Sequence, residues 1–263
     1  MLPELDNHTL APIWRVGHIY TTRYCWMGCP FCSLAVVASK PEPGLTLDQV
    51  DHAAVNFRNA DVVKLEGGLL LKEPFDYWLK LIRHIRHKDV RKLWAFSPQE
   101  LWHFHQAERR SVRDLLTGLK WVGVDGLNPG GSESLHRAWS PHRLSPSEWA
   151  TVAEAAHELG LTVRAALIVP PVPDGSLVND YLAALGDTPV TGFELKPLRA
   201  AHTRLAQHGD AEWLEVIPLV QQLKDRTPLP VHIRLDCWDD DARYLLSVAG
   251  ADGFFVPDWT VAP

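Results

Sequence analysis

Strand and helix signals alternate along almost the whole chain, and this alternation restricts the fold more than any other feature of the sequence. Short apolar runs that predict strands are separated by segments whose apolar residues recur at a helical period. Thr46 and Ser145 each open a capping box that marks a helix start. The run Leu161–Val169 is almost entirely apolar, as expected for a strand buried on both faces of a parallel sheet. Repeated strand–helix units of this kind imply right-handed crossovers between parallel strands.

About eight strands are predicted in a chain of 263 residues. This number and length favour an α/β fold, a complete or partial (β/α) TIM-like barrel, over a doubly wound sheet. We expect one domain over residues 1–263, with residues 1–15 as an N-terminal extension. The predicted strands are Val16–Tyr24, Asp61–Glu66, Lys92–Ser97, Trp121–Leu127, Leu161–Val169, Gly192–Pro197, Val231–Asp236 and Gly253–Val256, the last of which is expected to stop at Pro257.

The composition is that of a folded globular protein. Hydrophobic residues make up 46% and charged residues 22%, which excludes a disordered or collagen-like chain. Lys plus Arg number 26 and Asp plus Glu number 32, so the formal charge is −6, which argues against a protein that wraps nucleic acid. No apolar run approaches the ~20 residues of a bilayer crossing, and the first residues lack the features of a signal peptide. We therefore expect a cytoplasmic protein without a nucleic-acid or membrane partner.

Three of the four cysteines lie in one short segment, Cys25-Trp-Met-Gly-Cys29-Pro-Phe-Cys32, directly after the first predicted strand. Clustered thiols bind metal or act as redox groups more often than they form disulfides. A tight loop brings the three sulfurs to one face, where they can bind three irons of a cubane cluster. Because Cys237 is far away in the sequence, the fourth iron would stay open, which favours chemistry over a purely structural role. The alternatives are a zinc site completed by a histidine and three incidental thiols.

The same segment resembles the signature of the radical S-adenosylmethionine superfamily, in which a Cys-x₃-Cys-x₂-Cys loop follows the first strand of a (β/α) barrel. An aromatic residue precedes the last cysteine in that family, and Phe31 holds this position. The resemblance implies a [4Fe–4S] cluster bound by Cys25, Cys29 and Cys32, with S-adenosyl-L-methionine on the fourth iron. It also implies reductive cleavage of this cofactor to methionine and a 5′-deoxyadenosyl radical, with the electron supplied by a donor such as flavodoxin or ferredoxin.

Further motifs are similar to one branch of this superfamily, that of aminofutalosine synthase, dehypoxanthine futalosine cyclase and FO synthase. This branch implies an enzyme of lyase or transferase type that acts on a small aromatic or nucleoside-like substrate, in menaquinone or related cofactor biosynthesis. The similarity extends from about Val16 to Gly253 at low identity. The motifs that carry it are Glu66-Gly67-Gly68-Leu69, Lys92–Ser97, Gly126–Glu133, Arg143–Trp149, Ala156–Gly160, Thr191–Pro197 and Gly250–Asp252.

The resemblance and the strand positions together suggest which residues bind the cofactor. The glycine pair would let the backbone approach the methionine ammonium without an intervening Cβ. Arg164 lies in an otherwise apolar strand; we favour a side chain that points into the barrel and holds the methionine carboxylate over one in a structural ion pair. The expected cofactor-binding residues are Phe31, Glu66, Gly67, Gly68, Ser97, Glu133, Arg164 and Ile168.

The catalytic residue remains open, with Glu133, Arg164, Glu194 and Lys196 as candidates. Glu133 and Ser97 also have structural interpretations, as a solvated loop acid and as a helix cap respectively. Glu194 and Lys196 alternate with apolar residues and so lie on one side of a strand, where they either face a substrate in the barrel or form a salt bridge.

Two departures separate the chain from this branch. Where the branch has Gly-His-x-Glu after its fifth strand, this chain has Pro170-Pro171-Val172-Pro173-Asp174, which leaves only Asp174 as a carboxylate. The chain is also shorter. Because the loss of polar groups changes which ligand a site accepts, a radical enzyme with an unrelated substrate is an alternative. A non-catalytic iron–sulfur or zinc protein on the same barrel is another.

Overall fold

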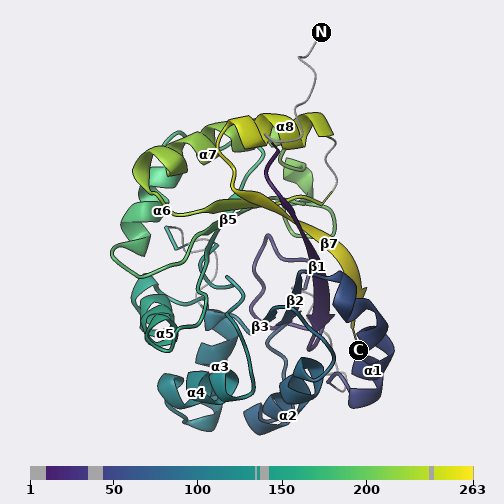
Figure 1. Ribbon diagram of the computed structural model, residues 1–263. Coiled ribbons are helices and arrows are strands. Elements are labelled where there is room, and N and C mark those ends of the chain that lie inside the picture. The colour runs from purple at the N-terminus through teal and green to yellow at the C-terminus, as the bar shows by residue number, and fades with distance from the viewer. Residues whose placement is uncertain (1–9, 35–43, 134, 137–141, 237–239, 263) are drawn as a thin grey trace.

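The computed structural model describes residues 10–34, 44–133, 135–136, 142–236 and 240–262. Within them, parallel strands form one curled sheet that helices cover on its outer side (Figure 1). The order of strands is β3-β2-β1-β7-β6-β5-β4, which confirms an α/β fold of the partial TIM-like barrel type. The strands are β1 (Ile13–Tyr20), β2 (Val62–Glu66), β3 (Leu93–Ala95), β4 (Ala165–Val169), β5 (Phe193–Pro197), β6 (Val231–Arg234) and β7 (Gly253–Val261).

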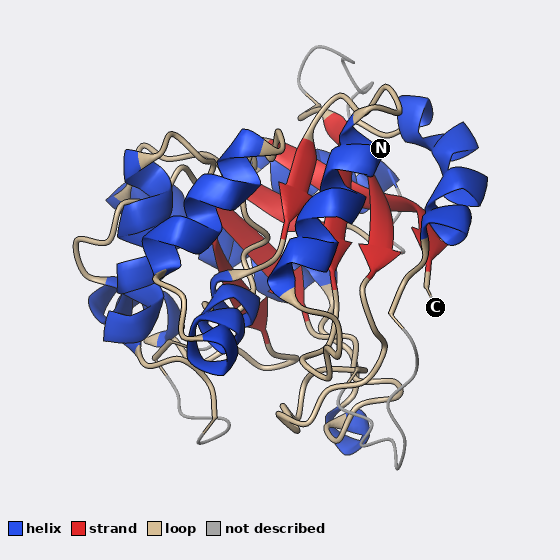
Figure 2. Ribbon diagram, turned by 90° about the horizontal axis from the view of Figure 1, so that it is seen from below, coloured by secondary structure: helices blue, strands red, loops and turns tan. Residues whose placement is uncertain are grey.

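Capping signals set the starts of several helices. Thr46, Ser97 and Ser145 each accept a hydrogen bond from the backbone three residues later, in complete capping boxes. No helix in the described part of the chain is long and apolar enough to cross a bilayer. Figure 2 shows the strands enclosed by helices. The helices are α1 (Leu47–Ala53), η1 (Ala54–Asn59), α2 (Phe75–Arg86), α3 (Pro98–Glu108), α4 (Val112–Trp121), α5 (Pro146–Glu158), α6 (Leu177–Leu185), η2 (Ala206–His208), α7 (Trp213–Arg226) and α8 (Asp240–Val248).

The strand predicted over Trp121–Leu127 does not form. Trp121 is instead the last residue of α4. Gly126 forms isolated parallel bridges to Trp94 in β3 and to Thr162 ahead of β4. A larger residue would not fit there, because a Cβ on Gly126 would lie 2.6 Å from the Cβ of Thr162. Backbone hydrogen bonds of the two flanking residues support these bridges, so a short segment links the two edges of the sheet where an eighth strand was expected.

Several strand boundaries also differ from the prediction, and those of β1 and β7 are the most informative. β1 begins at Ile13, so the last residues of the expected N-terminal extension belong to the sheet. β7 does not stop at Pro257 but continues beyond it. Its pairing with β1 shifts register between Val16 and Gly17. Such a bulge accommodates a proline that cannot donate a hydrogen bond to the neighbouring strand.

Alternation along the strands separates the main core from the interior of the barrel. On β5, Phe193 and Leu195 pack in the main core, whereas Glu194 and Lys196 point into the barrel. Lys64 of β2 faces the same interior, and its Nζ lies 3.2 Å from a carboxylate oxygen of Glu194. The interior is therefore filled by charged side chains that reach toward the carboxyl ends of the strands.

Candidate functional site

The three clustered cysteines lie on the loop that follows β1, at the carboxyl end of the barrel. Cys29 is buried, whereas Cys25 and Cys32 are partly exposed, and all three are free thiols. They pack with Met27 and Leu69 in one small cluster. The N–H of Cys32 donates a hydrogen bond to the carbonyl of Cys29 at 3.2 Å. The loop therefore gathers the cysteines on one side of the barrel mouth, as the sequence predicted.

Burial controls the protonation of these thiols. It raises the pKa of Cys25, and it raises the pKa of Cys32 to about 11. Negative charge on Cys25 and Cys29 raises the pKa of Cys32 further, so the three sulfurs lie within electrostatic range of one another. A bound metal would have to displace the protons of Cys25 and Cys32.

The geometry of the thiols differs from that of a site for one ion. In the described residues, no three His, Cys, Asp or Glu side chains are placed to hold a single metal ion. A cubane cluster needs a wider spacing of its ligands than a single ion does, because each of its cysteines binds a separate iron.

The glycine pair after β2 fixes the position of the cysteine loop. A Cβ on Gly68 would lie 1.9 Å from the carbonyl oxygen of Tyr24, directly before the first cysteine. A Cβ on Gly67 would lie 2.3 Å from Oγ1 of Thr21. The N–H of Gly68 donates to the carbonyl of Thr22 at 2.9 Å. The two loops therefore approach each other more closely than any residue with a side chain would allow.

A cavity of about 250 Å³ opens beside the cysteine loop. Its walls come from the carboxyl ends of several strands and from the loops that follow them, where the chemistry of barrel proteins is found. The cavity is lined by most of the expected cofactor-binding residues, namely Phe31, Glu66, Gly67, Ser97, Glu133 and Ile168, together with Cys32 and Lys196.

Glu133 is an ionised acid in the wall of this cavity. Its carboxylate accepts hydrogen bonds from Nη2 of Arg143 at 2.5 Å and from the N–H of Gly131 at 2.7 Å, and it lies 3.6 Å from Nζ of Lys196. Burial opposes its charge, but Arg143 and Lys196 outweigh burial and hold the pKa of Glu133 below its usual value. Nη1 of Arg143 also donates to Sγ of Cys29 at 3.4 Å. Arg143 therefore connects the ionised carboxylate to the cysteine loop.

Two further acids compensate the cations of the barrel interior. Burial opposes the charge of Glu66, but the hydrogen bond from His18 at 2.7 Å and the nearby Lys64 and Lys196 hold its pKa well below the usual range. Burial likewise opposes the charge of Glu194, and Lys64 and Lys196 lower its pKa to about 2. Glu194 is 1% exposed and does not line the cavity, whereas Lys196 does. Of the two candidates on β5, Glu194 is therefore a buried counterion, whereas Lys196 reaches the cavity.

Two buried side-chain oxygens at the cavity have no hydrogen-bond partner among the described residues. They are Oε1 of Glu100 and Oδ1 of Asn128. The other oxygen of Glu100 accepts bonds from the N–H and Oγ of Ser97 in the capping box of α3. Nδ2 of Asn128 donates to the carbonyl of Leu65 at 2.7 Å. Because an unsatisfied buried polar atom is costly, Oδ1 of Asn128 fits a ligand that carries a hydrogen-bond donor. Burial raises the pKa of Glu100 to about 8, so at neutral pH its free oxygen carries the proton and fits a ligand acceptor, and it fits a ligand donor once that proton is lost.

The protonation of Glu100 is expected to make stability depend on pH. Burial raises the pKa of Glu100 from 4.5 to about 8, so the folded protein holds this proton more tightly than the unfolded chain does. The free energy of unfolding should therefore fall as pH rises from about 4.5 to about 8, by at most about 1.4 kcal/mol per pH unit from this group, and should not depend on it outside that window. Glu100→Gln keeps the capping box and should remove this slope.

Urea unfolding between pH 5 and pH 9 tests this expectation. Glu148→Gln is the matched control, because Glu148 holds the same position in the capping box of α5 but is only half-buried. A slope that is identical in the wild type and in the Glu100→Gln variant would contradict the expected role of Glu100.

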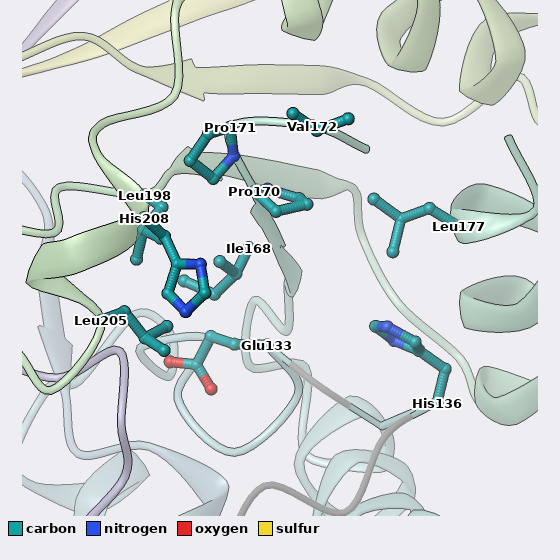
Figure 3. Close-up of a pocket in the computed structure, with 10 residues that line it drawn as sticks. All are labelled: Glu133, His136, Ile168, Pro170, Pro171, Val172, Leu177, Leu198, Leu205 and His208. Atoms are coloured by element: carbon teal, nitrogen blue, oxygen red, sulfur yellow. The ribbon is translucent and has the colours of Figure 1, made fainter. Parts of the chain in front are cut away.

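A second cavity, of about 340 Å³, adjoins the first and shares Glu133 and Ile168 with it (Figure 3). Most of its wall is apolar, and its polar groups are the Glu133 carboxylate and the imidazoles of His136 and His208. A space with apolar walls and a few polar groups is typical of sites for small organic molecules. The apolar lining is formed by Ile168, Pro170, Pro171, Val172, Leu177, Leu198 and Leu205.

Arg164 and Asp174 are the sequence candidates that the structure does not bring to this site. Arg164 precedes β4 and lines a cavity with residues at the opposite, amino ends of the strands. Its guanidinium lies over the ring of Phe255 and contacts His232 at this end, so the expected role toward the methionine carboxylate does not hold. The carboxylate of Asp174 accepts a hydrogen bond from the N–H of Ser176 at 3.0 Å and lines neither cavity at the carboxyl end. Cys237 lies outside the described residues.

Sequence reasoning missed several residues of the cavity. Tyr20 and Arg234 are the last residues of β1 and β6, whereas the sequence places these strand ends at Tyr24 and Asp236. The spacing of Glu100 after Ser97 is that of a capping box, but nothing in the sequence shows that the free oxygen of Glu100 is buried at a cavity. Arg143 was noticed only as part of a motif, because its partners Glu133 and Cys29 are brought to it by the fold.

No protein-family model matches the chain. The chain is nevertheless similar in sequence to several known proteins. The chain is 28% identical over 160 residues to 5-amino-6-(D-ribitylamino)uracil--L-tyrosine 4-hydroxyphenyl transferase of Archaeoglobus fulgidus, covering 57% of the chain and 45% of the relative. It is 26% identical over 170 residues to aminodeoxyfutalosine synthase of Thermus thermophilus (56% and 42%) and 28% identical over 152 residues to FO synthase of Streptomyces coelicolor (55% and 18%). The matches cover less than half the length of these relatives.

Solved structures agree on the fold. Methylornithine synthase (PylB) superposes with a TM-score of 0.69 at 15% identity, covering 95% of this chain and 72% of its own. HydG, a maturase of the [FeFe]-hydrogenase, superposes with a TM-score of 0.68 at 13% identity, covering 94% and 57%. At this identity the similarity concerns the fold alone. Together with the sequence relatives, this agrees with the resemblance noted from the sequence: the chain is similar in sequence to aminodeoxyfutalosine synthase and FO synthase, and it is similar in fold to HydG and methylornithine synthase.

Proposed function

We propose that the chain is a radical S-adenosylmethionine enzyme that acts on a small aromatic or nucleoside-like substrate. The observation that carries this proposal is the placement of three free cysteines at a barrel mouth beside two adjoining cavities, one polar and one apolar. The named relatives support an enzyme, because they are synthases and transferases.

The residues at the polar cavity fit a [4Fe–4S] cluster and S-adenosyl-L-methionine. Cys25, Cys29 and Cys32 would hold the cluster. When bound, the pair would supply one-electron cleavage of the sulfonium, which releases 5′-deoxyadenosine once the radical has been quenched. The free acceptor on Asn128 suits a hydroxyl or ammonium group of this cofactor, and the free oxygen of Glu100 can accept from the ammonium once its carboxyl has lost its proton.

The remaining expected residues shape the same cavity. Lys196 and Arg234 bring positive charge that suits the methionine carboxylate, in place of Arg164. Phe31, Glu66, Gly67, Ser97 and Ile168 line the wall, and Gly68 holds the cysteine loop in place. Glu133, ionised between Arg143 and Lys196, stands where the two cavities meet and can orient a hydroxyl or amine of either ligand.

The apolar cavity is the proposed substrate site. Its wall of leucines and prolines suits a flat, weakly polar ring, and the imidazoles of His136 and His208 can hydrogen-bond to substituents on that ring. Pro170 and Pro171 take the place of the polar motif of the branch, which favours a substrate different from those of the named relatives. A transferase reaction in menaquinone or related cofactor biosynthesis, with electrons from flavodoxin or ferredoxin, is the proposed context.

Anaerobic reconstitution with iron and sulfide tests this function. We expect a brown protein that releases 5′-deoxyadenosine when dithionite and S-adenosyl-L-methionine are added. A colourless zinc protein, or a cluster whose spectrum S-adenosyl-L-methionine does not alter, would overturn the proposal and leave a non-catalytic metal protein on the same barrel.

Lys196→Met is expected to weaken the binding of S-adenosyl-L-methionine about 10- to 100-fold without lowering the iron content, because a hydrogen bond to a charged group contributes about 1.5–3 kcal/mol. Equilibrium dialysis of the cofactor against the reconstituted protein measures the change. Lys80→Met, on the exposed face of α2, is the control. Equal affinity of the Lys196→Met variant and the wild type would remove Lys196 from the cofactor site.

A further inference from the structure

A third cavity, of about 500 Å³, lies at the amino ends of the strands. It shares no lining residue with the two cavities at the carboxyl end. Trp14 near the start of β1, Lys92 just before β3, Arg164 just before β4 and His232 near the start of β6 all contribute to its wall. This end of a barrel usually serves stability rather than binding, so the chemistry of its lining is informative.

The charge in this cavity is predominantly positive and poorly compensated. Of its four cations, only Arg91 has an ion pair among the described residues, with Asp61 at 2.9 Å. Lys92, Lys120 and Arg164 have no carboxylate within 4.0 Å in the described part of the chain.

The acid and the lysines of the cavity have other contacts. The one acid in the lining, Asp125, lies 3.4 Å from Arg86 and accepts a bond from the N–H of Leu93. Nζ of Lys120 donates to the carbonyl of Gly160, and Nζ of Lys92 lies over the ring of Trp14. None of these contacts places a negative charge beside the lysines.

Arg164 is the unusual member of this group, because it is only 6% exposed. Its Nη2 donates to the carbonyl of Phe193 at 2.7 Å and to Nδ1 of His232 at 2.5 Å. Its Nε has no partner among the described residues. A buried charge without a counterion is costly.

The pKa values of Arg164 and His232 agree with a buried guanidinium that has no neighbouring counterion. Burial lowers the pKa of Arg164 to about 10, against the distant charges of Glu194 and Asp252. Burial and then Arg164 lower the pKa of His232 to about 3, so His232 is neutral at neutral pH and adds no charge of its own.

Aromatic rings form the rest of the wall. Trp14, Trp94, Phe255 and His232 all line the cavity, and the ring of Trp94 lies edge-on to that of Phe255 with centroids 5.7 Å apart. Faces and edges of this kind suit a planar or apolar body beside the cations.

We propose that this cavity is a binding site for a small molecule that joins a planar ring to a phosphate or carboxylate group. Arg164, Lys92 and Lys120 surround the oxyanion, and Trp14 and Trp94 contact the ring. The site is independent of the proposed radical chemistry, since it lies at the other end of the barrel. An oxyanion there supplies the charge that the buried guanidinium lacks.

Equilibrium dialysis and tryptophan fluorescence with phenyl phosphate as the probe test the proposal on the full chain. We expect saturable binding that is tighter than that of inorganic phosphate, with no saturable binding of phenol. A parallel titration with benzoate shows whether the site prefers a carboxylate or a phosphate. The double variant Lys92→Ala/Lys120→Ala should weaken binding by about tenfold or more, and Arg164→Met should abolish it.

The Arg164→Met variant can fail to fold, because Arg164 is buried. Lys92 and Lys120 are exposed, so the double lysine variant tests the site without disturbing the core. Lys80→Ala, on the outer face of α2, is the matched control and should bind the probe as the wild type does. Absence of saturable binding, or equal affinity of the wild type and the double lysine variant, would overturn the proposal.

Discussion

Replacing Cys29 with serine is expected to abolish assembly of the iron–sulfur cluster and with it all release of 5′-deoxyadenosine. Cys29 is the buried member of the three thiols and lies at the centre of their small apolar cluster. With two thiolates left on the loop, the cubane loses one of the three sites that hold its irons. The result is measured by the iron content after anaerobic reconstitution. It is also measured by the absorption band at roughly 400 nm that thiolate-bound clusters show.

Cys237→Ser is the matched control for this experiment, because Cys237 is the remaining cysteine of the chain. We expect it to keep its full iron content and its cofactor cleavage. Loss of the cluster in Cys237→Ser would mean that a fourth protein thiol closes the cluster, and the open iron needed for S-adenosyl-L-methionine would not exist. Full iron content in Cys29→Ser would equally contradict the proposed ligand set.

Gly68→Ala is expected to lower the free energy of unfolding by about 3 kcal/mol and to reduce cluster loading. The added Cβ would lie 1.9 Å from the carbonyl oxygen of Tyr24, and 3.0 Å from the Cβ of Cys25. The nearest obstacle is backbone, so no side-chain rotation relieves it, and the loop that carries Cys25 must move. Urea unfolding gives the stability, and iron content gives the effect on the site.

Gly175→Ala provides the comparison for Gly68→Ala. A Cβ on Gly175 would have no heavy atom within 4 Å, and its backbone does not need a positive φ. The alanine there should leave stability unchanged or raise it slightly, because it restricts the unfolded chain. If both variants had the same stability, close packing of the glycine pair against the cysteine loop would not be what fixes the loop.

Local sequence signals predicted the elements well where short-range physics decides them. The capping boxes at Thr46 and Ser145 start helices as expected, because the hydroxyl and the side chain three residues later satisfy each other. The strand predicted over Trp121–Leu127 did not form because its first two residues end and cap α4, which leaves only a short segment that bridges the sheet edges at Gly126. Pro257 failed as a stop signal because a bulge between β1 and β7 tolerates the missing donor.

The sequence likewise predicted part of the candidate site but not all of it. The cysteine spacing predicted three thiols gathered on the loop after β1, and period-2 alternation correctly put Glu194 and Lys196 on the same side of β5. Arg164 was assigned to the wrong end of the barrel because the predicted strand began at Leu161, whereas β4 begins at Ala165. That shift moves Arg164 from the middle of a strand to its amino end.

The sequence by itself determined the order of elements, the parallel sheet and the three thiols on the first loop, since each depends on spacing along the chain. Only the tertiary structure decided that Arg143 meets Glu133 and Cys29, that one oxygen of Glu100 is left without a partner at a cavity, and that a positive cavity lies at the far end of the barrel. These features join residues that are distant in sequence, and their burial and pairing depend on how the barrel closes rather than on any local pattern.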